Sequence, residues 1–79
     1  MSTVELRGLL LNWGKNESGY RWVDVGGFRL DAGKNGVPDS VIEALVGSMV
    51  KVIVETSWVE RKDGSRFVRR RLVSVRPLE

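Results

Sequence analysis

Residues 48–76 read SMVKVIVETSWVERKDGSRFVRRRLVSVR, the longest strand-like stretch in the chain. Its first half alternates apolar and polar side chains with the two-residue period of a half-buried strand, with valines at Val50, Val52 and Val54. The dipeptide Asp63-Gly64 follows, which is typical of a tight turn between antiparallel strands. The pattern therefore predicts a long hairpin whose turn lies at these two residues.

Taking Asp63 and Gly64 as the central turn residues predicts the pairing of the two strands. Glu60 then faces Phe67, Trp58 faces Arg69, and Val52 faces Val75. In this register one face of the outer half carries four side chains together: Trp58, Phe67, Arg69 and Arg71. The root of the hairpin is apolar and belongs to a core. We therefore expect the basic outer part, at about residues 56–71, to project from the body.

The positive charge of the chain is concentrated in the same hairpin. The whole chain has 79 residues and a formal net charge of +3. Residues 57–76 contain seven cationic and two anionic side chains, a net +5, so the rest of the chain carries −2. This asymmetry favours a polyanion or an acidic protein as the partner of one side of the molecule.

Upstream, residues 3–13 form the first strand-like segment, in which Val4 and Leu6 alternate with charged residues. A glycine at position 8 predicts a bulge or a sharp bend in this strand. Residues 12–19 are polar and bounded by glycine, so we expect a loop there.

Residues 20–25 alternate again, with Tyr20 and Trp22 on the face opposite the valines. Gly26-Gly27 predicts a two-residue hairpin turn, after which residues 28–31 form a short return strand. We assign Phe28 and Leu30 of this strand to the core.

Residues 38–46 are the best helix candidate. Ser40 and Glu43 have the spacing of a capping box, and Pro38 is alternatively suited to a first helical turn. Gly47 is placed to end the helix in a left-handed conformation. A helix this short is unstable alone, so it must pack on the sheet.

Composition excludes several classes of enzyme. The chain has no cysteine and no histidine, which removes thiolate and imidazole zinc sites and the usual nucleophile–histidine pairs. Its carboxylates are scattered, and no glycine-rich phosphate loop is present. We therefore expect no enzymatic activity, no catalytic residues, no cofactor and no metal. The sequence shows no secretory signal and no apolar run long enough for a membrane span, so we expect a cytoplasmic protein without a membrane partner.

The predicted succession of three strands, a short helix and two strands resembles the OB-fold (oligonucleotide/oligosaccharide-binding) superfamily over residues 3–76. The resemblance is to the small S1-type and single-strand-binding domains. It implies a mainly β class with one short helix, in which residues 1–79 form a single five-stranded OB-like barrel of order β-β-β-α-β-β. An SH3-like barrel is the alternative fold.

In that superfamily the ligand crosses the second and third strands and is flanked by the first-to-second and fourth-to-fifth loops. Carried over to this sequence, the resemblance implies contacts from Trp13 and Lys15 in the first of these loops and from Phe28 or Arg29 in the third strand. Together with the hairpin register, it predicts a nucleic-acid-binding set of ten residues: Tyr20, Trp22, Arg29, Trp58, Arg61, Lys62, Arg66, Phe67, Arg69 and Arg71.

Interleaved aromatic and cationic side chains suit single-stranded nucleic acid, because bases stack on aromatic rings while cations contact phosphates. We therefore predict non-enzymatic binding of single-stranded nucleic acid with little sequence preference, with single-stranded DNA slightly favoured over RNA. The alternative is a protein-interaction module, in which Trp58 and Phe67 dock on a protein partner or on a second copy of the chain.

Overall fold

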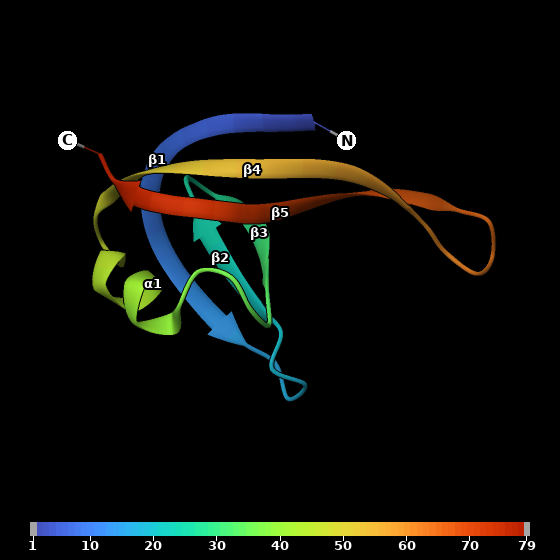
Figure 1. Cartoon of the computed structure of the whole chain (residues 1–79), viewed down its shortest axis with the longest axis horizontal. Coiled ribbons are helices and arrows are strands. Elements are labelled where there is room, and N and C mark those ends of the chain that lie inside the picture. Colours follow the sequence, from blue (N-terminus) through green and yellow to red (C-terminus); the bar gives the residue numbers. More distant parts are fainter. Residues whose placement is uncertain (1, 79) are drawn as a thin grey trace.

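The computed structural model describes residues 2–78, which form a mainly β structure with one short helix (Figure 1), as the sequence predicts. The described part of the chain contains no helix with the length and apolar character needed to cross a membrane. The elements in chain order are β1 (Ser2–Lys15), β2 (Arg21–Val25), β3 (Phe28–Gly33), α1 (Asp39–Leu45), β4 (Met49–Glu60) and β5 (Arg66–Pro77).

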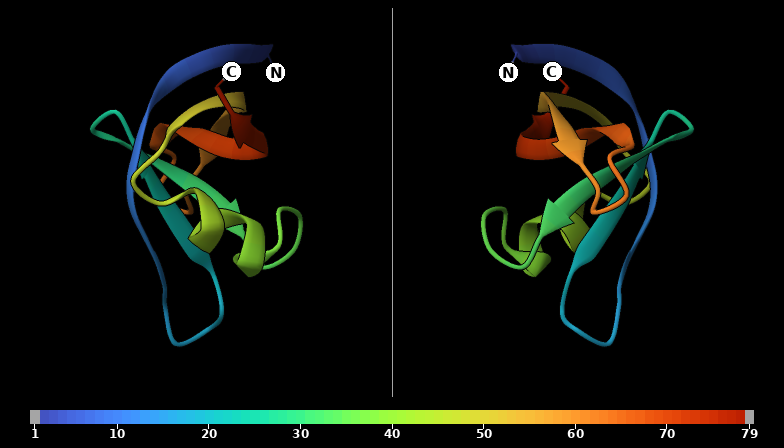
Figure 2. Two further views of the ribbon diagram at one scale, coloured as in Figure 1. Left: turned by 90° about the vertical axis from the view of Figure 1, so that its left-hand side faces the viewer. Right: turned by 90° about the vertical axis from the view of Figure 1, so that its right-hand side faces the viewer.

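The five strands form one sheet that closes on itself in the order β1-β2-β3-β5-β4. The order around the ring thus differs from the order along the chain, because β5 lies between β3 and β4. The β3–β5 contact is parallel and rests on the single pair Asp31 and Arg71, whereas the other neighbours are antiparallel. Figure 2 shows the closed ring from two sides.

The strand β1 bends so that it serves two neighbours. Its first part, through Leu9, pairs with β4, and its second part, from Leu10, pairs with β2. The bend expected near Gly8 is therefore present, but the bulge lies between Leu10 and Asn12. The loop predicted over residues 12–19 is wrong in its first half, since pairing with β2 keeps the chain extended as far as Lys15.

The core fills the ring with residues from every element. Its fully buried members are Leu10, Val23, Leu30, Ile42, Val50, Val52 and Val54. Helix α1 covers the end of the ring remote from the outer part of the β4–β5 hairpin (Figure 1), and its Ile42 is completely buried. The prediction that Phe28 is core is wrong: the residue directly follows the Gly26-Gly27 turn, at the end of the sheet, and is 59% exposed.

The prediction for the N-terminal end of α1 is wrong, and the prediction for its C-terminal end is confirmed. The capping box is wrong, because Pro38 occupies the N-cap position and no side chain caps the helix. Gly47 does adopt the expected left-handed conformation, with φ of +86°, and its N–H donates to the carbonyl of Leu10. This bond joins the end of the helix segment to the bend of β1.

Beyond the ring, β4 and β5 continue as a two-stranded hairpin (Figure 1). The last pair of β1 with β4 is Ser2 with Thr56, and β3 pairs with β5 only at Arg71. Residues 57–70, called the projecting hairpin below, therefore have no further strand beside them within the described chain. They lie along the longest dimension of the molecule, which measures 42 Å.

The predicted register of the projecting hairpin is wrong by one residue. Glu60 pairs with Arg66, and Trp58 pairs with Val68. The reason is the loop: the Arg61 N–H donates to the Ser65 carbonyl, so three residues rather than two make the turn. A bulge opposite Ile53 and Val54 inserts one residue into β5 and restores the predicted pair of Val52 with Val75.

This shift changes which side chains share a face. Because Trp58 pairs with Val68 while Phe67 pairs with Val59, strand alternation places Trp58 and Phe67 on opposite faces. Arg69 and Arg71 share the face of Phe67, opposite Ser57 and Glu55. The predicted grouping of Trp58 with Phe67, Arg69 and Arg71 is therefore wrong.

Candidate functional site

A cleft of about 410 Å³ opens beside β3 and the start of β5. It lies where the two strands diverge beyond the single pair of Asp31 with Arg71. Five of the ten predicted site residues line it, although they come from separate parts of the sequence: Tyr20, Trp22, Arg29, Phe67 and Arg69. The structure thus brings together half of the predicted set on the outer side of the ring.

Trp22 is held flat on the sheet by its neighbours on both sides. It pairs across the strands with Gly14, and a Cβ at Gly14 would lie 2.4 Å from a carbon of the indole ring, so glycine makes room for the ring. The guanidinium of Arg29 lies over this ring, 4.0 Å from its centroid, and is also paired with Asp24 at 3.2 Å. A ligand therefore meets a guanidinium stacked on an indole.

Two further cations lie over aromatic rings at the site. The Arg61 guanidinium is 4.5 Å from the centroid of Phe67, and the Lys34 ammonium is 4.8 Å from the centroid of Tyr20. The predicted contact of Trp58 with Arg69 does not form, since the two side chains lie on opposite faces of the projecting hairpin. Each of the three aromatic rings of the cleft thus has a cationic side chain over it.

A second cleft of about 320 Å³ adjoins the first. It is lined by Arg71 and Lys34, and it shares Tyr20, Asp31 and Arg69 with the first cleft. Asp31 and Arg69 form an ion pair at 3.2 Å, which ties β3 to the base of the projecting hairpin. This pair and Tyr20 therefore mark the boundary between the two clefts.

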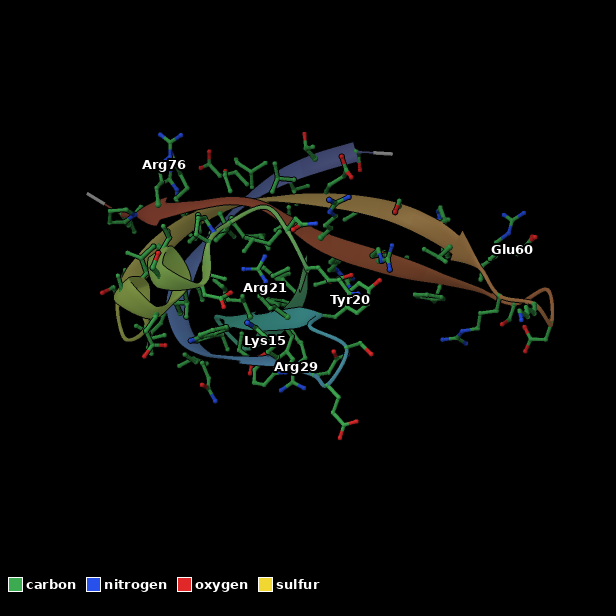
Figure 3. All side chains as sticks on the ribbon, turned by 60° about the horizontal axis from the view of Figure 1, so that its bottom comes forward. Lys15, Tyr20, Arg21, Arg29, Glu60 and Arg76 are labelled. Atoms are coloured by element: carbon green, nitrogen blue, oxygen red, sulfur yellow. The ribbon has the colours of Figure 1, made fainter. Side chains whose placement is uncertain are left out.

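The remaining predicted residues lie elsewhere. Trp58 is 70% exposed on the other face of the projecting hairpin, where it lines a smaller cleft with Ser2, Thr56 and Val68. Lys62 lies in the loop at the tip, and Arg66 shares the face of Trp58. Figure 3 shows how far Glu60, near this tip, lies from Tyr20 and Arg29.

Trp13 and Lys15, implied as contacts by the resemblance, make structural contacts instead. The Trp13 indole packs against the core, and its N–H donates to the carboxylate of Glu43 at 2.5 Å. The Lys15 ammonium is paired with Asp39 at 2.7 Å. Both residues therefore fasten β1 to helix α1.

Arg21 is a residue whose role the sequence interpretation missed. Its side chain is only 3% exposed, and all five of its N–H donors are satisfied. The sequence did contain a sign of this role, because Arg21 lies on the apolar face of residues 20–25. A charged side chain on such a face either interrupts the strand pattern or is buried with all its hydrogen bonds made. The acceptors of Arg21 are the carbonyls of Ala32, Gly33, Asn35 and Val37 and the carboxylate of Asp39.

Two carboxylates have pKa values below their ordinary range. Hydrogen bonds from Lys15 and then from Arg21 lower the pKa of Asp39. Hydrogen bonds from the side chain and backbone of Ser65 lower the pKa of Asp63 in the loop of the projecting hairpin. Among residues 2–78, no three side chains of the metal-binding types cluster closely enough to hold an ion.

No protein-family model matches this sequence, and neither the curated proteins nor the solved structures with which the chain was compared include a match.

Proposed function

We propose that this protein binds single-stranded nucleic acid, without catalysing a reaction, through the two adjoining clefts. The observation that carries the proposal is the convergence of Tyr20, Trp22, Arg29, Phe67 and Arg69 on one cleft. Aromatic rings with cations over them provide both kinds of contact that a single strand needs. Bases stack on the rings or on the guanidinium planes, while the cations attract phosphates.

We infer an OB-like barrel rather than an SH3-like one. The ring order β1-β2-β3-β5-β4, the helix between β3 and β4, and the bent β1 shared by two neighbours support this assignment. In OB folds the outer face of the second and third strands is a common ligand surface, and here the clefts lie beside that face. The residues of the clefts, and not the fold, support the proposed function, because a shared fold does not determine function.

Phe67 and Trp58 provide a matched pair of variants, being aromatic residues from the same hairpin on opposite faces. We expect Phe67→Ala to weaken the binding of a fluorescently labelled dT oligonucleotide about tenfold, the usual effect of losing one stacking ring. Trp58→Ala should leave the affinity nearly unchanged. Fluorescence anisotropy titrations measure the affinities of both variants. Labelled dT and rU strands of equal length also compare DNA with RNA.

The salt dependence of the same titration tests the phosphate contacts. Lys34→Ala should reduce the slope of log affinity against log salt by about 0.7, the value for one phosphate contact with a single strand. Arg76→Ala is the matched control, because Arg76 lines neither cleft and lies apart from Tyr20 and Arg29 (Figure 3), and it should leave the slope unchanged. Absence of binding to either strand at low salt would overturn the proposal.

The alternative, docking on a protein, is favoured by one observation. Trp58 remains 70% exposed next to Val68, and it lines neither of the two adjoining clefts. An exposed tryptophan of this kind is a common anchor of protein interfaces. Sedimentation that depends on concentration in the parent protein, and not in Trp58→Ala, would support this second role.

A further inference from the structure

Asp31 is out of place on a surface that binds phosphates. It lines both clefts, and its carboxylate lies among the cations Lys34, Arg69 and Arg71. A negative charge there opposes every phosphate of a bound strand. Its presence calls for a contact with some other part of the ligand, and the edge of a base is the part that offers hydrogen-bond donors.

The contacts of Asp31 fix its position without using up its acceptors. One carboxylate oxygen accepts the N–H of Gly33 at 2.9 Å, and the other lies 3.2 Å from Nε of Arg69 in an ion pair. A carboxylate has about four acceptor positions, so about two remain open. The side chain is 32% exposed, which leaves these positions accessible from the clefts.

Arg69 is engaged in a similarly incomplete way. Its Nε is paired with the Asp31 carboxylate at 3.2 Å, and its side chain is 49% exposed. Within the described chain, its two terminal nitrogens make no hydrogen bond or ion pair, so their N–H groups are free to donate to a ligand. Asp31 therefore presents about two open acceptor positions directly beside the free N–H donors of Arg69. The N–H of Gly33 holds the Asp31 carboxylate in place.

We propose that Asp31 and Arg69 read the edge of one base and select guanine; this inference rests on the proposed function. Guanine alone among the bases offers two adjacent donors, N1–H and the N2 amino group, next to the acceptors O6 and N7. The carboxylate accepts from both donors, while the guanidinium donates to O6 and N7. The other bases offer the carboxylate a single N–H group at a time.

The stacking surfaces around the pair are suited to hold the base in reach. Trp22 with Arg29 and Phe67 with Arg61 line or border the same cleft as Asp31 and Arg69. A base stacked on either platform has its edge within the cleft, where the ion pair lies. Stacking contributes affinity for every base, and the ion pair adds the discrimination.

The test uses labelled thirteen-nucleotide dT strands that carry one variable base at the centre, which avoids the runs of guanine that form quadruplexes. We expect the strand with dG to bind about tenfold more tightly than those with dA, dC or dT, as one good bidentate contact gives. Replacing dG by deoxyinosine, which lacks the N2 amino group, should remove most of the preference. Replacing it by 7-deazaguanine should remove the part that depends on the contact of Arg69 with N7.

Asp31→Asn should abolish the preference for dG while the affinity for the all-dT strand stays the same or rises, because a negative charge is lost. The matched control is Asp24→Asn, which removes the carboxylate paired with Arg29. It should raise the affinity for all four strands equally and keep the preference.

Three results would overturn the inference: equal affinity for all four strands, a preference that survives in Asp31→Asn, or deoxyinosine binding as tightly as dG. Equal affinity with clear binding leaves the proposed function intact. Failure of every strand to bind overturns both. The comparison of bases uses the unmodified protein, so it decides the matter even if Asp31→Asn does not fold.

Discussion

Arg21 shows how one buried side chain organises a segment without regular structure. Its five hydrogen bonds reach the end of β3, the following loop and the first turn of α1. The guanidinium is shielded from water, since the Arg21 side chain is 3% exposed. The loop therefore depends on Arg21 for its shape, and the second cleft, which includes Lys34 and Asn35 of that loop, depends on it indirectly.

We expect Arg21→Met to lower the free energy of unfolding by about 3 kcal/mol or more, since each buried polar group left unpaired costs about 1–3 kcal/mol. Arg29→Met is the matched control. The Arg29 side chain is 64% exposed, and losing its ion pair and ring contact should cost less than about 1 kcal/mol. Urea denaturation measures both, and equal losses would contradict the role assigned to Arg21.

At the scale of elements, the projecting hairpin and the ring differ in how they are supported. The residues of β4 as far as Thr56 pair with strands on both sides, whereas residues 57–69 pair only with each other. A two-stranded hairpin is marginally stable alone. The projecting hairpin should therefore open locally far more readily than the ring.

Gly47 and Gly64 test this difference with the same substitution. Both have positive φ, +86° and +88°, and an added Cβ would meet no atom within 4 Å at either position. Alanine therefore introduces only backbone strain, about 1–2 kcal/mol in each case. In Gly47→Ala we expect the Tm to fall by about 4–8 °C per kcal/mol.

In Gly64→Ala we expect a smaller fall in Tm, because opening the projecting hairpin relieves the strain, together with faster amide hydrogen exchange over residues 57–70. Thermal melting and hydrogen exchange measured by mass spectrometry distinguish the two variants. Equal changes in Tm, with unchanged exchange in the hairpin, would show that the hairpin and the ring unfold as one unit.

At the scale of the whole molecule, Asp39 joins three segments. Its carboxylate accepts hydrogen bonds from Lys15 at the end of β1 and from Arg21 at the start of β2, and it lies in the first turn of α1. These contacts stabilise the ionised form and lower its pKa in the folded state. Ionised Asp39 therefore stabilises the fold at neutral pH.

Because the folded-state pKa is lowered, this contribution is present above the unfolded pKa of about 3.9 and is lost as the pH falls through the lower folded value. We expect Asp39→Asn to be less stable than the parent at pH 7, and the difference to narrow in acid. The difference for Asp63→Asn should narrow in acid in the same way, because hydrogen bonds from Ser65 in its own loop lower the pKa of Asp63 too. Urea midpoints at neutral and acid pH test this, and a constant difference for Asp39→Asn would contradict it.

Sequence patterns predicted the elements better than their contacts. Alternation correctly placed Trp22 opposite Val23 and Val25, and Gly26-Gly27 marked a real turn with positive φ at both residues. The register of the projecting hairpin failed, because a three-residue loop and a bulge in β5 each displace the pairing by one residue. Neither feature is visible in the local alternation of side chains.

By itself, the sequence determined which side chains share a face of a single strand and where positive charge is concentrated, because both follow from the two-residue period and the order of residues. Only the tertiary structure decided which strands are neighbours and hence which aromatic residues share a cleft. A shift of one residue moves every side chain of a strand to the other face, so Phe67 joins Trp22 while Trp58 does not. The closure of the sheet likewise brought Asp31 to Arg69, which lie far apart in the chain.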